Sequence, residues 1–152
     1  REAVVEVVGD ICAEAPVVAG GALDLVVGYG KPTMAIAGLY VTKPTEVRGV
    51  VITGVKQVFM VSGPVTFVDC SFPDVEVQIT NAMPKSHVEF RSCSVVAGNK
   101  FQGRCCLRVL AGRATLRGTK VVNMVSGSVS REGSCVADSG SRIFPRADVL
   151  FA

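Results

Sequence analysis

Apolar and polar residues alternate along short stretches of this chain, and turn residues separate the stretches. In residues 65–72 (VTFVDCSF) and again in residues 88–95 (VEFRSCSV), the first and third positions are apolar and the polar residues lie between them. Alternation with a period of two is typical of a strand with one buried face. The two segments match in type at nearly every position, and the match places Cys93 at the position of Cys70. A strand that returns after a fixed interval indicates a coil stacked on the coil before it.

The same alternation returns along the chain at a nearly constant interval. The turn residues that precede the alternating stretches are Gly21, Lys43, Gly63, Ser86, Gly112 and Gly127, and their numbers differ by 22, 20, 23, 26 and 15. A coil of this length traces a perimeter of roughly 70–75 Å, enough for three short strands and three turns. The pattern therefore predicts one all-β domain over residues 1–152, a single-stranded parallel β-helix of about six coils. The last step is too short for the same coil, so either residues 128–152 form a cap or tail, or Gly127 is the wrong anchor.

The predicted coil has consequences for its interior. Like residues stack on like, so we expect valine over valine and Cys70 over Cys93, in a narrow core without large aromatic side chains. An antiparallel β-sandwich or jelly roll shares this composition and is the alternative fold. Asn-Gly and Asp-Gly pairs, which favour tight hairpins, are absent from the sequence and count against that alternative.

Composition fits an all-β protein and narrows its class. The chain is 49% apolar and only 19% charged, and it is rich in valine and glycine. No run of about 18 apolar residues occurs, so we expect no membrane span, and the first residues do not resemble a signal peptide. The six cysteines form no CxxC pair, and His87 has no cysteine at metal-site spacing. We therefore expect reduced, buried cysteines, no metal and no cofactor; a secreted disulfide framework is the minority interpretation.

The cadence of the coil, G-x-φ-x-φ-x-x-C-x-φ (φ apolar) followed by a glycine corner, resembles a viral family. It is carried by residues 63–72, 86–95 and 112–121, and more loosely by residues 45–52. It is similar to the right-handed β-helix of the adenovirus early-region large tumour antigen and of the trimeric surface-knob minor capsid protein of reptile-type adenoviruses. The resemblance covers roughly residues 43–127. It implies a right-handed helix and a non-enzymatic viral protein, which either assembles on a capsid as a homotrimer or binds host regulators and a ubiquitin-ligase partner.

Candidate catalytic residues are few. β-helix lyases and hydrolases of polysaccharides place acidic residues on neighbouring coils. Asp69 is the best candidate here, with Asp74, Glu76 and Glu89 nearby, but Ser92 occupies the position of Asp69 one coil later. We expect these carboxylates to be solvated charges on an outer face or turn. A polysaccharide-binding or polysaccharide-cleaving β-helix remains an alternative function.

Two further sequence features fail as catalytic sites. Residues 28–33 (GYGKPT) lack the first glycine of a phosphate-binding loop and place proline after the lysine, so they predict a turn. His87 follows a corner and has no partner of a catalytic triad in the sequence, so a surface position is expected. We therefore predict that the chain is not an enzyme.

Charge is distributed unevenly along the chain. Residues 1–89 carry ten acidic and six basic side chains, whereas residues 90–152 carry three acidic and ten basic ones. In a solenoid, distance along the sequence becomes height, so one end should be acidic and the other basic. The predicted contact residues for an acidic partner surface are Arg104, Arg108, Arg113, Arg117 and Lys120. Nucleic acid is disfavoured, because few aromatic residues interleave with these cations.

Together these features predict a viral structural or assembly module, capsid-associated or at the virion surface. Its expected partners are a second and third copy in a homotrimer, or capsid and host proteins with acidic surfaces. Its expected location is the virion or the infected host cell. Outward-facing valine and phenylalanine residues are expected at the subunit contacts. A viral early protein that binds host regulators is the second alternative.

Overall fold

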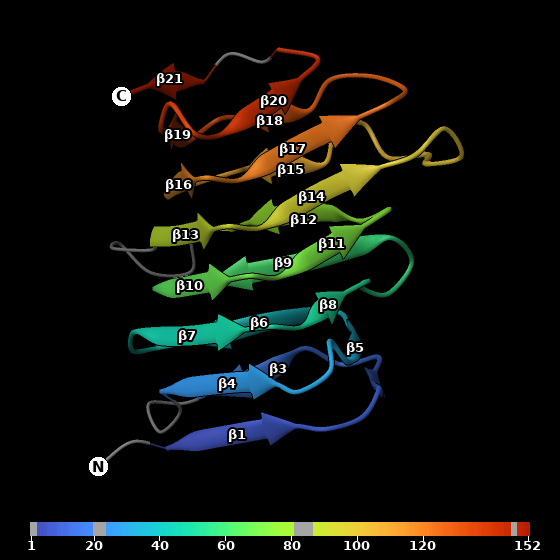
Figure 1. Cartoon of the computed structure of the whole chain (residues 1–152), viewed down its shortest axis with the longest axis vertical. Helices are drawn as coiled ribbons and strands as arrows, with labels where there is room; N and C mark the ends of the chain where they lie inside the picture. Colours follow the sequence, from blue (N-terminus) through green and yellow to red (C-terminus); the bar gives the residue numbers. More distant parts are fainter. Residues whose placement is uncertain (1–2, 20–23, 81–86, 147–148) are drawn as a thin grey trace.

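The chain winds into a parallel β-solenoid, seen in a computed structural model that describes residues 3–19, 24–80, 87–146 and 149–152. The described residues form 21 strands and no helix. In Figure 1 the strands of one sheet run from left to right at the front, those of another run from right to left behind, and the chain climbs as it turns. This path is a right-handed coil. The predicted fold is therefore confirmed, and the antiparallel sandwich is excluded because all strand pairs in the three sheets are parallel.

Three sheets, here called A, B and C, form the faces of the solenoid, and their strands follow one another in the order A, B, C. Sheet A contains β1 (Val4–Val7), β4 (Leu25–Gly28), β7 (Thr45–Arg48), β10 (Val65–Val68), β13 (His87–Arg91), β16 (Arg113–Arg117), β19 (Ser134–Ala137) and β21 (Leu150–Phe151). Sheet B contains β2 (Ile11–Ala13), β5 (Thr33–Ile36), β8 (Val51–Ile52), β11 (Ser71–Pro73), β14 (Ser94–Ala97), β17 (Lys120–Asn123) and β20 (Arg142–Phe144). Sheet C contains β3 (Val17–Ala19), β6 (Gly38–Val41), β9 (Val58–Ser62), β12 (Glu76–Ile79), β15 (Leu107–Val109) and β18 (Val129–Arg131). Six turns are complete, and β19, β20 and β21 continue sheets A and B above them.

The observed register follows the predicted repeat through the centre of the chain. Val65 pairs with Val88, and Val88 pairs with Ala114, as the spacing of the anchors Gly63, Ser86 and Gly112 predicts. The anchors Gly21 and Ser86 themselves lie outside the described residues. The last anchor is wrong: Ala114 pairs with Cys135, so the turn residue before that strand is Gly133 and not Gly127.

Gly127 misleads because residues 124–127 repeat residues 60–63 (MVSG) letter for letter without sharing their structure. Residues 60–62 belong to strand β9, whereas residues 124–127 form an exposed turn after β17. Asn123 shapes that turn, since its side-chain oxygen accepts hydrogen bonds from the backbone N–H groups of Val125 and Ser126 at 2.9 and 3.1 Å. Asparagine commonly turns the chain in this way.

The core contradicts the expectation of an interior without large aromatic side chains. Four phenylalanine rings meet there, and Phe67 lies 5.4 Å from Phe90 in a stacked arrangement and 5.2 Å from Phe72 in an edge-to-face arrangement. Phe59 completes the cluster at 6.1 Å from Phe67. All four are fully buried. The sequence repeat already places Phe67 under Phe90, and the two rings stack in the structure.

The corner between sheets A and B repeats one backbone conformation. The residues at this corner with positive φ are Gly30, Lys31, Gly49, Asp69, Ser92 and Gly118, at 76°, 53°, 69°, 53°, 53° and 53°. From the second to the sixth turn, at least one left-handed residue bends the chain sharply from sheet A into sheet B. Glycine adopts this conformation with least strain. The residue after the left-handed one is Cys70 in one turn and Cys93 in the next, and both are buried. The Ser94 N–H donates a hydrogen bond to the Cys70 carbonyl at 3.0 Å. The prediction that Cys70 lies under Cys93 is therefore confirmed.

Candidate interaction surfaces

The five cations predicted to contact an acidic partner lie on different faces of the solenoid. Arg113 and Arg117 belong to β16 in sheet A, Arg108 to β15 in sheet C, and Lys120 to β17 in sheet B. Arg104 lies in the loop before β15. The structure therefore brings together Arg113 and Arg117 alone, while the other three point from separate sides of the same turns.

Two of these arginines are held by carboxylates on the outer faces. Glu89 on sheet A accepts hydrogen bonds from Arg91 and from Arg117, the latter at 2.7 Å. Glu89 is 8% exposed, so the arginines cover it from water. They lower the pKa of the Glu89 carboxyl, because their hydrogen bonds and charges outweigh the opposing effect of burial. His87, on the same strand, contacts the Thr115 hydroxyl through Nε2 at 2.8 Å.

A second buried carboxylate lies on sheet C. Glu76 is 7% exposed and forms an ion pair with Arg108 at 3.4 Å, while the Gln78 amide donates to it at 2.6 Å. The Cys105 thiol donates to the other oxygen at 3.5 Å. Burial opposes ionisation, but these hydrogen bonds and the Arg108 charge lower the pKa of Glu76. Glu76 and Glu89 are thus covered and paired, and the expectation of solvated carboxylates is wrong for both.

The aspartates tie neighbouring turns together. Asp10 accepts a hydrogen bond from the Thr33 N–H, Asp24 from Ala3, Asp74 from Gly98 and Asp138 from Gly118, at 2.8, 2.8, 2.6 and 3.0 Å. The backbone hydrogen bond from Ala3 lowers the pKa of Asp24. Each bond joins a residue of one turn to a residue of an adjacent turn, so the short acidic side chains stabilise the stacking of one turn on the next.

Asp69, the residue with the best sequence case for catalysis, lies at the exposed corner between sheets A and B. It forms an ion pair with Lys31 at 3.0 Å, two turns below. Ser92 occupies the same corner one turn above, as the sequence repeat predicted. Within the residues that the structure describes, no three His, Cys, Asp or Glu side chains form a group that could hold a metal ion.

The cysteines occupy two environments. Cys12 is exposed, whereas Cys70, Cys93, Cys105, Cys106 and Cys135 are buried. Burial raises the pKa of the thiols of Cys105, Cys106 and Cys135 to about 11, 12 and 11. These buried thiols therefore stay protonated at neutral pH and pack as small apolar side chains.

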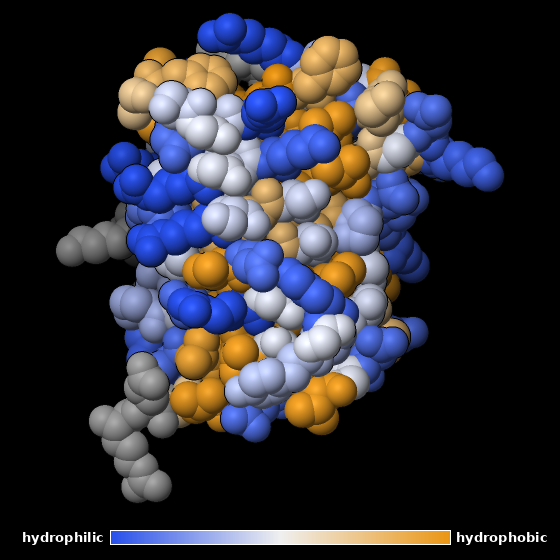
Figure 2. Space-filling model, in the orientation of Figure 1, coloured by the Kyte–Doolittle hydropathy of each residue, from blue (hydrophilic) through white to orange (hydrophobic). Residues whose placement is uncertain are grey.

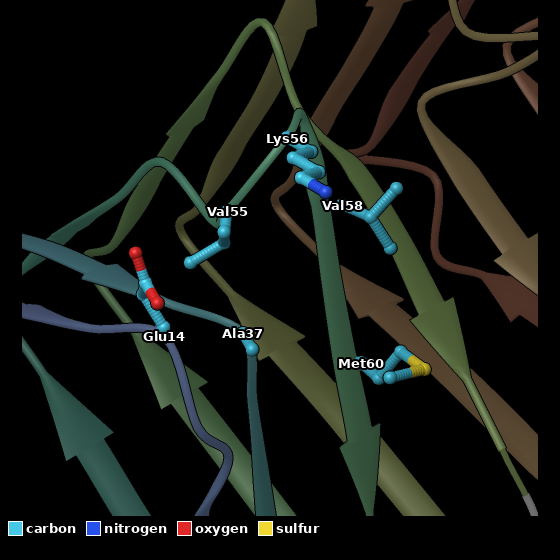
Figure 3. Close-up of a pocket in the computed structure, with 6 residues that line it drawn as sticks. All are labelled: Glu14, Ala37, Val55, Lys56, Val58 and Met60. Atoms are coloured by element: carbon cyan, nitrogen blue, oxygen red, sulfur yellow. The ribbon is translucent and has the colours of Figure 1, made fainter.

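A hollow of about 430 Å³ opens on the outer side of sheet C (Figure 3). Its apolar lining is Ala37, Val55, Val58 and Met60, and Glu14 and Lys56 bring one charge of each sign. Figure 3 shows Val55 between these two charged side chains and Ala37 below them. Lys56 and Gln57 both have positive φ, at 53° and 62°, in a tight turn, although neither residue is a glycine. Glu14 and Lys56, the two charged side chains of the lining, are both exposed.

The N-terminal end of the solenoid is open. A cavity of about 150 Å³ enters the core there, and every residue that lines it is apolar. Its lining is Val5, Val7, Ile11, Val17, Val26, Met34, Ile36, Leu39, Val47, Ile52 and Phe59. Val5 and Ile11 line this space and are 47% and 42% exposed. In residues 3–19 the charged side chains are all acidic, namely Glu6, Asp10 and Glu14.

Exposed apolar side chains gather at the two ends of the solenoid. In Figure 2 such side chains reach the surface at the lower, N-terminal end and at the upper, C-terminal end. The described large apolar residues that are exposed are Val4, Val5, Val8, Ile11, Tyr29, Met124, Val125, Phe144, Leu150 and Phe151. All but Tyr29 belong to the first turn or follow residue 123. Turns three to five bury their large apolar residues at least in part.

The fold defines a parallel β-solenoid, a class of repeat protein that stacks one structural unit on the next. No family model, no curated protein and no solved structure matches the chain. Among the described residues no helix is long and apolar enough to cross a membrane. The geometry of the surfaces is therefore the basis of any functional argument.

Sequence reasoning missed the two arginine-covered carboxylates and the contrast between the two ends. The signal for Glu89 was present, because the register that pairs Val88 with Ala114 also places Thr115 beside Glu89 and Arg117 on the adjacent outward position. The partners of Glu76 follow from no repeat that the sequence made visible, since residues 99–106 form an irregular loop between β14 and β15. The apolar cavity at the first turns is visible only in the structure.

Proposed function

We propose that this chain is a non-catalytic structural module that associates with further copies of itself. The observation that carries the proposal is the placement of exposed apolar side chains at the two ends of the solenoid, with charged and half-buried side chains on the faces between them. Apolar surface that is shielded elsewhere in the repeat but exposed at its ends favours association.

The acidic side chains support a structural role. Those with the best sequence case for catalysis have structural partners: Asp69 pairs with Lys31, and Glu76 and Glu89 are covered by arginines. Carboxylates that pair with cations of other turns in this way stabilise the fold. The ends are then the surfaces where apolar side chains remain exposed. This pattern suits a protein that contributes shape and contacts.

The cadence shared with the adenoviral β-helices extends this proposal to a viral structural protein, in the virion or the infected cell. The homotrimer that the resemblance implies is one form that self-association can take. Arg113 and Arg117, at the two ends of β16 in sheet A, are the part of the predicted basic surface that could meet an acidic partner on one face.

Light scattering coupled to size exclusion tests the proposal. The chain is expected to exceed the mass of one copy, 15.9 kDa, as its concentration rises from about 1 µM to about 1 mM, the range of weak to moderate association. A mass that stays at one copy over the whole range would refute self-association. Contacts through the ends should also bury Cys12, on β2, whose reaction with a thiol reagent is then expected to slow as the mass rises.

A further inference from the structure

Sheet B carries an apolar column on its outer face, across β14, β17 and β20. Val96 pairs with Val122, and Val122 pairs with Phe144, so these outward side chains follow one another at the spacing of adjacent strands, about 4.8 Å. Val96 and Val122 are half-buried and Phe144 is exposed. Met124 and Val125, in the turn after β17, are exposed as well. Figure 2 shows hydrophobic side chains in this upper right part of the solenoid, with hydrophilic ones on either side.

Two cations lie directly opposite each other beside this column. Lys120 pairs with Arg142 in the register of β17 and β20, and both side chains are exposed. Like charges directly opposite each other on adjacent strands destabilise a sheet. Within the described residues, neither cation forms an ion pair with a carboxylate. Asp138, the described acidic residue nearest to Arg142 in the sequence, accepts hydrogen bonds from Gly118 and Ser141.

Sheet A shows how this fold accommodates two such cations. Arg91 and Arg117 are likewise opposite each other, in the register of β13 and β16. Glu89 accepts a hydrogen bond from each of them, one on each carboxylate oxygen. On sheet B the outward neighbours of Lys120 and Arg142 along β17 and β20 are apolar, so these two strands supply no such carboxylate. The pair on sheet B therefore has the arrangement of the pair on sheet A without its anion.

We infer that this face of sheet B binds an acidic protein segment. Apolar side chains of the segment cover the outward column, and one of its carboxylates lies between Lys120 and Arg142, as Glu89 lies between the arginines of sheet A. An apolar centre with a charged rim is the usual anatomy of a protein interface. The column faces outward from the side of the solenoid, so the inference depends neither on the ends of the chain nor on the proposed self-association.

The shape of the column favours a protein segment over an anionic membrane. Side chains that anchor a protein at a membrane reach about 5–10 Å into the boundary between headgroups and acyl chains. Val96 and Val122 are half-buried in the surface of the sheet, so a partner must bring its own side chains to them. An amphipathic segment does so, with apolar residues on one face and acidic residues beside them.

Fluorescence anisotropy with a labelled peptide tests the inference. The probe is a helical peptide of about 14 residues, with leucine along one face and glutamate on both flanks. Two control peptides replace its glutamates by lysine or its leucines by serine. One protein variant carries Lys120→Glu and Arg142→Glu. The matched control carries Lys56→Glu and Arg113→Glu, which changes the net charge by the same amount at two cations that also form no ion pair within the described residues.

The wild-type chain and the control variant are expected to bind the acidic peptide with a Kd between about 1 µM and about 1 mM, the range of weak association. The control peptides should bind the wild type at least tenfold more weakly. Reversal of Lys120 and Arg142 should weaken binding of the acidic peptide at least tenfold and strengthen binding of the lysine peptide. Phe144→Ala, which removes apolar surface and no charge, should weaken binding of the acidic peptide about fivefold or more.

Four outcomes would overturn the inference. They are no binding of the acidic peptide up to about 1 mM, equal binding of the lysine peptide by the wild type, a loss of binding in the control variant in place of the Lys120 and Arg142 variant, and binding to phosphatidylserine vesicles without binding to the peptide. A thermal unfolding scan shows whether each variant folds, and a gain of binding to the lysine peptide cannot arise from a misfolded chain.

Asp148 lies outside the described residues and is tested separately by Asp148→Asn. Affinity for the acidic peptide is expected to change less than about twofold, because the carboxylate comes from the partner. A gain of tenfold or more would show that Asp148 already occupies the place between the cations, and it would also overturn the inference. A chain that stays monomeric yet binds the peptide as expected refutes self-association alone.

Discussion

Replacing Phe67 by alanine removes the ring at the centre of the aromatic core. Phe67 is fully buried and its ring contacts those of Phe59, Phe72 and Phe90, with centroids 5.2 to 6.1 Å apart. A phenylalanine-to-alanine change at such a site costs about 3–5 kcal/mol, from lost burial and from the cavity that remains. Domains of this kind are stable by about 5–15 kcal/mol, so the variant should fold with a much reduced margin.

Urea unfolding followed by far-ultraviolet circular dichroism measures this loss. Work at low concentration keeps association out of the measurement. We expect a lower midpoint with an unchanged slope, and a melting temperature lower by roughly 6–20 °C, at about 2–4 °C per kcal/mol for a chain of this size. Phe144→Ala is the matched control, since its ring is 64% exposed and should cost no more than about 0.5 kcal/mol.

The stacked core would be refuted if Phe67→Ala cost less than about 1 kcal/mol, or no more than Phe144→Ala. Phe67→Leu gives a second point, because it keeps part of the volume and should fall between alanine and the wild type. A variant series in which leucine is as damaging as alanine would show that shape at this position, and not the amount of buried apolar surface, determines the loss.

Three further predictions follow from single sites. Glu89→Gln should cost about 1–2 kcal/mol at neutral pH, more than Glu46→Gln on the same face, because Glu89 is buried under two arginines. The folded pKa of Glu89 lies below its ordinary value of 4.5, so the stability that the carboxylate contributes is present above pH 4.5 and disappears as the pH falls through the folded pKa. A difference in stability between wild type and variant that persists in stronger acid would contradict the role of the Glu89 carboxylate. Gly118→Ala should cost about 1 kcal/mol through backbone strain alone, since φ is 53° and no atom lies within 4 Å of the added methyl group. Gly127→Ala is the control, because its site is equally open but has no positive φ. It should be neutral or slightly stabilising in the same urea titration. A thiol reagent should label one cysteine per native chain, Cys12, and all six after unfolding; rapid labelling of a second native thiol would contradict the burial of the other five.

The sequence predicted the parts of the fold that each turn must share with the next. Alternation and the constant interval placed Val65, Phe67 and Cys70 beneath Val88, Phe90 and Cys93, because an inward side chain in a solenoid is constrained by the one above and the one below. The left-handed corner also repeats, but Asp69 and Ser92 adopt it without being glycine, so composition alone does not reveal it.

The failures arose where residues depart from the repeat. Matching letters in residues 60–63 and 124–127 suggested equivalent turns, yet Asn123 folds the second segment into an exposed turn. The covered state of Glu76 depends on Arg108 and Cys105, which an irregular loop brings into place. Glu76 and Arg108 belong to adjacent turns, but the irregular loop of residues 99–106 hides their register from the sequence.

The ends of the solenoid connect the fold to the proposed assembly. Val5 lies in the same inward column as Val26, and Phe151 extends the column of Leu116 and Ala137. In the middle of the chain this inward position is buried by the turns on either side, whereas Val5 and Phe151 are 47% and 42% exposed. The periodicity that builds the core therefore also creates two apolar surfaces, and it creates them equally.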